Sequence, residues 1–306
     1  MIDIYFKSIR DAELSQIQDF RVGSWINITD ATMEDLSKVS ELTGIEVNDI
    51  LDCLDKYEIP RIEHIDNDVI IYSRHSSELE EGMYTSTLAI LLSKNFIFTI
   101  SPQKSRIIDS LIQSKIKFAT TQKSKLLLYI LLKVIQDYTT KIKLVRNAVI
   151  ELEYKMQSIT NKAIVTLTKN EEILNQYLSC LIPLRNLLEA IFSGRYIDLY
   201  EKDYDLLQDL MIAVKQSEDI CAISIKSIRS LRDAYQILFT NDVNKTIKLL
   251  TAITIIFTIP TIIASIYGMN VSLPLEKEPH AFFIIMNITI LLSLVCVFIF
   301  ARKKWL

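Results

Sequence analysis

The stretch that decides the fold is Asn244–Asn270, NKTIKLLTAITIIFTIPTIIASIYGMN, near the end of the chain. No charged residue occurs between Lys248 and Glu276. A bilayer core of about 30 Å needs roughly 20 helical residues, so this run predicts a membrane-spanning helix over about residues 249–267. A second uncharged apolar run, Ala281–Ala301, predicts a second span by the same argument.

The hydroxyl side chains of the first predicted span follow a regular spacing. They recur at steps of three and four residues, which at about 100° per residue places them in an arc of roughly 80° on one helix face. The members are Thr251, Thr254, Thr258, Thr261 and Ser265. Two interpretations are open. This face lines a water-filled path, or its hydroxyls bond to carbonyls of their own helix and pack against neighbouring helices.

The same face extends beyond the hydroxyls in both directions. Towards the N-terminus it reaches Asn244, Ile247 and Leu250, and towards the C-terminus it reaches Gly268. Large apolar side chains repeated around a pore can close it by dewetting. Ordinary helix packing explains the same residues, and both readings stay open.

Charges on either side of the two spans predict the orientation. Lys245 and Lys248 precede the first span, and Arg302, Lys303 and Lys304 follow the second, whereas the loop VSLPLEKEPH has two acids and one base. By the positive-inside rule, both termini are expected in the cytoplasm. The basic tail is most simply an anchor on anionic lipid, with an electrostatic ring at a pore entrance as the alternative. Glu276 and Glu278 either concentrate cations at an outer mouth or are ordinary loop charges.

Composition excludes several classes of protein. The chain has 306 residues, 50% of them hydrophobic, and a net charge of −3, which argues against a nucleic-acid partner. The four cysteines form no Cys-x-x-Cys pair, so they support neither a zinc site nor a disulfide framework. The three histidines lack metal-ligand spacing, and no phosphate loop or nucleophile elbow occurs. We therefore expect no enzyme activity and no organic cofactor.

Residues 1–120 have the pattern of a cytoplasmic α/β domain with a partly antiparallel sheet. Short β-rich runs alternate with turn signals, and the predicted strands are Ile2–Phe6, Trp25–Ile28, Arg61–Ile65, Val69–Ser73, Thr87–Leu92 and Phe96–Ile100. A helix is predicted over Thr32–Leu42, with Asp30 or Thr32 as its cap and Gly44 as its stop, and a second short helix over Val47–Leu54. Helices begin again at Ser105–Phe118.

Residues 121–270 have helical periodicity throughout. Two long antiparallel helices are predicted within residues 121–200, over Leu126–Met156 and Thr168–Phe192, with Pro183 as a candidate kink. Residues 201–270 predict a stalk helix that continues into the first span. Its apolar stripe between Leu207 and Leu238 implies self-association or packing on the other helices. The remaining segments are an external loop (271–280), the second span (281–301) and a basic tail (302–306).

The C-terminal third resembles a known family. The tetrad Tyr267-Gly268-Met269-Asn270 closes the first of two spans, and the second span ends in the tail Lys303-Lys304-Trp305-Leu306. This combination is similar to the CorA-type channels, the two-span metal ion channels with a Gly-Met-Asn motif. Asp209, Asp233 and Asn244 are also at family-like positions. The resemblance covers roughly residues 200–306 well and the rest only in architecture.

The resemblance implies a function and an assembly. It implies a funnel-shaped homopentamer in the cell membrane that admits Mg2+ passively, driven by the membrane potential, with Co2+ and Ni2+ also passing. Gly268, Met269 and Asn270 would form the selectivity filter. A ring of neutral amide and carbonyl oxygens suits a hydrated Mg2+, because this ion loses its waters reluctantly. From the residues alone, Gly-Met-Asn is also explained as a helix C-cap.

The resemblance also implies that cytoplasmic Mg2+ gates the channel. Asp209 would help to bind a regulatory Mg2+ between neighbouring subunits, with Asp66 and Asp68 as candidate partners unless they form a solvated turn. Val271-Ser272-Leu273-Pro274 replaces the acidic and aromatic residues that more commonly follow the tetrad. A zinc transporter of the same fold, with or without proton coupling, is therefore the alternative. A membrane-anchored scaffold or sensor is the alternative from another class, although an anchor needs no aligned hydroxyls.

Overall fold

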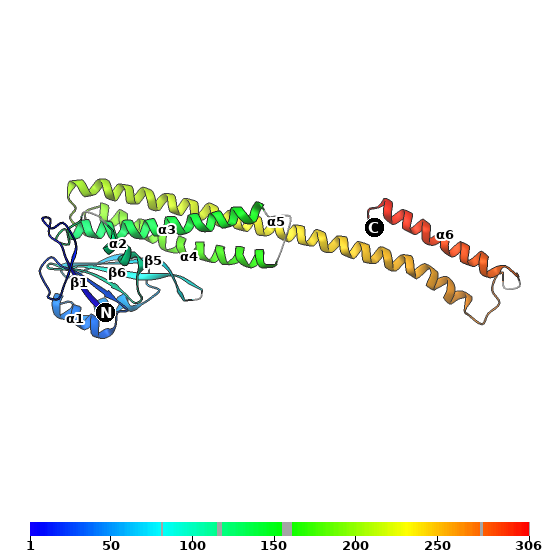
Figure 1. The fold of residues 1–306 in the computed structure, drawn as a ribbon, viewed down its shortest axis with the longest axis horizontal. Helices are drawn as coiled ribbons and strands as arrows, with labels where there is room; N and C mark the ends of the chain where they lie inside the picture. The colour runs from blue at the N-terminus through cyan, green and yellow to red at the C-terminus, as the bar shows by residue number, and fades with distance from the viewer. Residues whose placement is uncertain (81, 115–117, 155–160, 276–277, 306) are drawn as a thin grey trace. The chain divides into compact units, whose positions relative to one another are not determined.

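The computed structural model describes residues 1–80, 82–114, 118–154, 161–275 and 278–305 (Figure 1). The chain divides into two compact units, Met1–Leu231 and Arg232–Leu306. One helix, α5 (Glu201–Tyr267), contributes to both units. The first unit contains all the described strands and helices α1 to α4, and the second contains the rest of α5 and helix α6 (Ala281–Arg302).

Seven strands form one sheet in the order β2-β1-β3-β7-β6-β5-β4. Neighbouring strands are antiparallel except β3 and β7, which are parallel, with Trp25 opposite Ile97. The predicted mixed sheet is therefore present. Its strands are β1 (Ile2–Phe6), β2 (Ser15–Ile17), β3 (Trp25–Thr29), β4 (Arg61–Ile65), β5 (Asp68–Glu80), β6 (Met83–Leu92) and β7 (Ile97–Ser101).

Helix α1 (Met33–Thr43) begins and ends where its sequence signals indicate. The Thr32 hydroxyl accepts a hydrogen bond from the Asp35 backbone N–H, and the Asp35 carboxylate accepts one from the Thr32 N–H at 3.1 Å. This reciprocal capping box makes Thr32, and not Asp30, the N-cap. Gly44 ends the helix with a φ of 86°, a left-handed conformation that glycine adopts without steric penalty.

The two faces of the sheet are covered by different helices. On one face, Leu36 of α1 and Ile50 of the 3-10 helix η1 (Val47–Leu54) pack with Ile70 and Leu91 of the sheet. Helices α3 (Lys123–Tyr154) and α4 (Asn161–Phe192) contact β5, and α4 also contacts β4 and β6. Figure 1 shows these long helices on the face opposite α1. Helix α2 (Arg106–Gln113) packs on α3.

Helix α5 is continuous over 67 residues, including Pro260, as the periodicity predicts. Its first half packs on α3 and α4. Ser217 and Thr139 share a hydrogen bond of 2.9 Å, and the Cys221 thiol donates to the Leu174 carbonyl at 3.1 Å. Packing within one chain therefore covers the predicted stripe between Leu207 and Leu231, and self-association is not needed to bury this part.

Four details differ from the sequence prediction. Strand β2 is additional, because three residues are too short to show a period. Strand β5 extends to Glu80 and β6 begins at Met83, so the hairpin is longer than its apolar portion. Helix α4 begins at Asn161 and continues through Pro183. Asp68 is buried at the start of β5, with its carboxylate accepting from the Lys94 N–H at 3.2 Å, so it is not part of a solvated turn.

Candidate functional site

Helix α5 ends directly before the three predicted filter residues. The Gly268 N–H donates to the Ala264 carbonyl at 3.0 Å, and the Met269 N–H donates to the Ile266 carbonyl at 3.2 Å. A Cβ on Gly268 would lie 3.3 Å from the Ala264 carbonyl oxygen, so this position favours glycine because the backbone approaches closely. Asn270 follows the last helical bond and is exposed in the single chain.

The hydroxyl face of α5 is exposed along its length within one chain. The Thr254 hydroxyl donates to the Leu250 carbonyl at 2.8 Å, and the Thr258 hydroxyl donates to the Thr254 carbonyl at 2.7 Å. Thr261 makes the same bond to the Phe257 carbonyl at 2.9 Å. These hydroxyls therefore bond back to their own helix, as one interpretation requires. Their oxygen lone pairs remain available on the exposed face, so a polar path is also compatible with this geometry.

The N-terminal end of this face combines one amide with two large apolar side chains. Asn244 is exposed, and Ile247 and Leu250 are 55% and 65% exposed. On the same turn, the Lys245 ammonium pairs with the Asp242 carboxylate at 2.9 Å. Exposed apolar side chains of this size are typical of a surface that another molecule covers.

Of the residues predicted for the regulatory site, Asp209 lies on α5, and its candidate partner Asp68 is the first residue of β5. Asp209 and Asp233 are both exposed on α5, and Asp66 lies in the turn between β4 and β5. Among the described residues, no group of three or more His, Cys, Asp or Glu side chains could hold a metal ion. A site with three or more such side chains at Asp209 would therefore need ligands from another subunit or from residues outside the described ranges.

The flanks of the two apolar segments include charges and an aromatic anchor. Glu276 lies outside the described residues, whereas Glu278 is exposed and donates its N–H to the Leu275 carbonyl at 3.0 Å. Three exposed basic side chains lie at the end of α6, where Arg302 is its last residue and Lys303 and Lys304 follow. The Trp305 ring stacks on Phe300 with centroids 5.6 Å apart. Tryptophan beside basic residues is typical of a membrane–water interface.

Both candidate spans are helical and exposed in the single chain. The apolar window in α5 is 6% buried and that in α6 is 0% buried. A soluble core helix would be mostly covered by its own chain, so this exposure favours lipid or further copies as the covering material.

One polar feature of the first unit was missed at the level of sequence. Arg74 on β5 is 8% exposed and lines a cavity together with Tyr57 and Ser179. A lone arginine in a β-rich run is a weak signal, since most arginines are exposed. The walls of the cavity come from distant segments, and no local motif joins them.

Comparison with known proteins identifies the family. The family model described as "CorA-like Mg2+ transporter protein" matches residues 21–303. The cobalt/magnesium transport protein CorA of Methanocaldococcus jannaschii is 29% identical over 313 residues, covering 98% of this chain and 96% of the relative. The protein of the same name from Thermotoga maritima is 24% identical over 318 residues, covering 98% and 89%.

A solved structure agrees over the full length. The complete structure of the CorA magnesium transporter from Methanocaldococcus jannaschii matches with a TM-score of 0.84 and 27% identity, covering 100% of this chain and 99% of the solved one. The family match and the structural match both cover nearly the whole chain. The chain belongs to the CorA-like Mg2+ transporter family.

Proposed function

We propose that this chain forms a homopentameric, funnel-shaped channel that carries Mg2+ into the cell, with one α5 from each subunit lining the path. One observation carries the proposal. Helix α5 continues without a break from the first unit into the apolar segment and ends at Tyr267, directly before Gly268-Met269-Asn270. The polar face of that helix is left exposed by its own chain.

Asn270 is the residue proposed to select the ion. Mg2+ binds oxygen ligands in octahedral geometry and usually keeps several waters, so a site that captures it from water must accommodate the hydrated ion. A ring of asparagine oxygens is neutral and accepts hydrogen bonds from those waters. The close backbone approach at Gly268, 3.3 Å from a would-be Cβ, supports a tight turn that presents Asn270 at the end of the helix.

The threonine bonds explain how the path would conduct a hydrated cation. A hydroxyl that donates its proton to a carbonyl four residues earlier has only acceptor capacity left. The waters around Mg2+ present their hydrogens outward, so acceptors on the wall suit them. Thr254, Thr258 and Thr261 are all held in this acceptor state. Ile247 and Leu250 would close the path at its cytoplasmic end by dewetting.

The membrane potential would drive entry. A divalent ion gains about 4.6 kcal/mol per 100 mV, twice the value for a single charge. The exposed basic tail and the lysines before the first span support a cytoplasmic location for both termini. Co2+ and Ni2+ would pass as well, because a filter that contacts the hydration shell discriminates weakly among divalent ions of similar size.

Cytoplasmic Mg2+ would close the channel by binding near Asp209. Asp209 is exposed in one chain, which suits a site shared between subunits. Such a switch needs a higher affinity for Mg2+ in the closed state than in the open state. We expect Asp209→Ala to weaken inhibition of the current by internal Mg2+, whereas Asp205→Ala, an exposed aspartate one turn earlier, leaves it unchanged. Unchanged inhibition in Asp209→Ala would remove this residue from the regulatory site.

The central experiment measures ion entry into liposomes that contain the purified protein. An inside-negative potential is imposed without a proton gradient, and Mg2+ and Zn2+ are compared. We expect Mg2+ entry in the wild type and at least about a tenfold loss in Asn270→Ala, equivalent to about 1.4 kcal/mol or more in the barrier. Asn287→Ala is the matched control, since that amide donates to the Phe283 carbonyl within α6.

The other outcomes are equally informative. Zn2+ entry that requires a proton gradient would replace the proposal with the zinc transporter. No entry of either ion would favour a membrane-anchored scaffold. An equal loss of Mg2+ entry in Asn287→Ala would show that asparagine replacement disturbs the spans in general. The effect of Asn270→Ala would then no longer support Asn270 as a filter residue.

A further inference from the structure

The first unit has a partly open cavity of about 640 Å³, lined by residues that have no part in the proposed ion path. Its walls come from the segment after η1, from β5 and β6, and from α4. The lining residues that matter here are Tyr57, Pro60, Arg74, Thr85, Ser179 and Cys180. The volume is within the range of small-molecule sites, about 300–1,000 Å³.

Arg74 is the only cationic side chain among the described residues that line this cavity. It is 8% exposed, and its hydrogen-bond acceptors among the described residues are all neutral oxygens. Nε and Nη2 donate to the Thr85 hydroxyl at 3.2 and 2.8 Å, and Nη2 also donates to the Thr85 carbonyl at 3.1 Å. Nη1 donates to the Glu58 carbonyl at 3.3 Å. Within the described ranges, one N–H of Nη1 has no acceptor.

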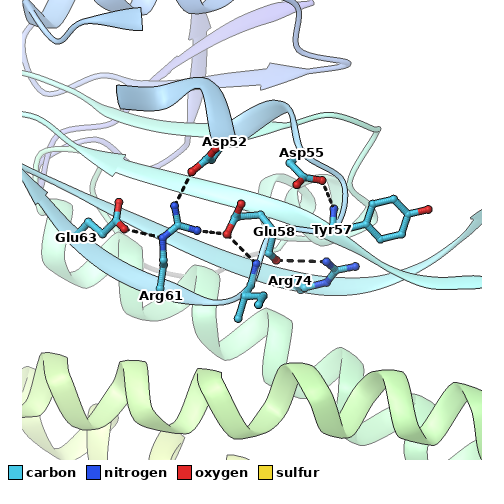
Figure 2. A network of polar contacts seen from close by, with 8 residues as sticks. Asp52, Asp55, Tyr57, Glu58, Arg61, Glu63 and Arg74 are labelled. Atoms are coloured by element: carbon cyan, nitrogen blue, oxygen red, sulfur yellow. Dashed lines mark hydrogen bonds and ion pairs between the residues drawn. The ribbon is translucent and has the colours of Figure 1, made fainter. Parts of the chain in front are cut away.

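The carboxylates drawn together with Arg74 in Figure 2 are engaged elsewhere. The Arg61 guanidinium contacts three of them, at 2.7 Å for Asp52 and Glu63 and at close range for Glu58. Asp55 accepts from the Tyr57 N–H at 2.7 Å. Figure 2 shows Arg74 joined to this network only through the Glu58 backbone carbonyl. Three carboxylates therefore surround the less buried arginine, whereas no carboxylate of a described side chain is bonded to the more buried one.

Burying a guanidinium without a counter-charge is unfavourable, and arginine cannot relieve this by losing its proton. The missing charge can come from solution. We propose that the cavity binds a small organic anion, with a phosphate or carboxylate group against Nη1 of Arg74. Arginine is well suited to either oxyanion because its donors form a planar fork. The apolar surfaces of Pro60 and Cys180 would contact the body of the ligand, and Tyr57 lies at the rim with 63% exposure.

Calorimetric titration of the full-length protein in detergent tests this proposal independently of transport. Inorganic phosphate and succinate are titrated separately in a buffer without Mg2+. We expect saturable binding of at least one anion, and at least about a tenfold weaker affinity in Arg74→Met. Arg10→Met, which removes an exposed arginine from the same unit, is the matched control and should bind as the wild type does. Binding of phosphate alone would identify a phosphorylated ligand, and binding of succinate alone would identify a carboxylic acid.

A second variant keeps Arg74 in place, because Arg74 also ties Glu58 to Thr85. Ser179 is exposed on α4 at the cavity wall, so Ser179→Trp should fill the space without removing any buried charge. We expect the same loss of binding with an unchanged unfolding temperature. Binding of neither anion by the wild type, or full binding by Arg74→Met or by Ser179→Trp, would overturn the proposal.

Discussion

Each half of α5 repeats one kind of side chain along a single face, apolar in the first half and hydroxyl in the second. The two halves are covered in different ways. Leu207 and Ile228 are 0% exposed in one chain, whereas Ile247 and Leu250 are 55% and 65% exposed. In the first half, polar side chains contact other helices, as when Glu218 pairs with Arg185 at 3.0 Å. In the second half, the threonines bond to their own backbone. The first half is therefore stabilised by its own chain, whereas the second half is left uncovered by it and, in the proposed channel, would be covered by lipid and further copies.

The largest expected effect comes from placing the same charge in each half. Ile228→Asp puts a carboxylate into a fully buried position, and we expect it to lower the free energy of unfolding of the first unit by more than about 4 kcal/mol. Ile247→Asp should leave that free energy unchanged and raise Mg2+ flux, because a charged ring keeps the closed path hydrated. Denaturant unfolding followed by the fluorescence of the buried Trp25, together with liposome flux, measures both quantities.

Similar destabilisation by both substitutions would contradict the comparison, because it would mean that Ile247 is also covered within the folded chain. An unchanged flux in Ile247→Asp would remove the apolar side chains from the gate while leaving the packing argument intact. The two readouts therefore test stability and gating separately.

The sequence predicts α5 and α6 well because long helices repeat the same signal over many turns. It predicts α1 to within one residue at each end, with Thr32 as one of two candidate caps, since Thr32, Asp35 and Gly44 act through local hydrogen bonds and backbone conformation. It underestimates the β5–β6 hairpin, because side chains such as His75 and Ser86 are polar and yet buried. Their burial results from the helices packed on the sheet, and the alternation of polar and apolar residues in the sequence does not indicate it.

The two proposed sites, the polar face of α5 and the cavity at Arg74, also differ in whether local sequence or tertiary packing forms them. The polar face of α5 can be located from spacing alone, because a helix fixes the direction of every side chain. The cavity at Arg74 cannot be found in this way, since Tyr57, Arg74 and Ser179 meet only through tertiary packing. Burial decides whether an arginine needs a counter-charge, and burial is a property of the folded unit.

Lowering the pH should reduce the free energy of unfolding of the first unit, because this unit buries His75. His75 is 2% exposed, and burial lowers the pKa of its imidazole below 6.5, although the Ser76 carbonyl and the Asp137 charge act in the opposite direction. Below about pH 6.5, the His75 imidazole binds a proton more readily in the unfolded chain than in the folded one. The free energy of unfolding therefore decreases as the pH is lowered below about 6.5, by up to about 1.4 kcal/mol per pH unit for this one proton.

The measurement is the slope of unfolding free energy against pH between pH 7 and pH 5. His75→Gln should reduce this slope, and any constant loss from repacking does not alter it. His280→Gln, at an exposed position before α6, should leave the slope as it is in the wild type. Equal slopes in His75→Gln and the wild type would show that His75 takes up its proton without unfolding.

The smallest expected effect concerns the exposed half itself. Thr258→Val removes an acceptor oxygen from the proposed path but preserves the shape of the side chain, so we expect Mg2+ flux to fall by less than about tenfold, or about 1.4 kcal/mol. Thr289→Val is the matched control, because the Thr289 hydroxyl makes the same bond, to the Ile285 carbonyl at 2.8 Å, on α6. If the acceptor state of the α5 hydroxyls matters for a hydrated ion, only Thr258→Val reduces flux. A reduction of equal size in both variants would instead assign the hydroxyls to helix packing, and the polar face would then describe how copies of α5 contact one another.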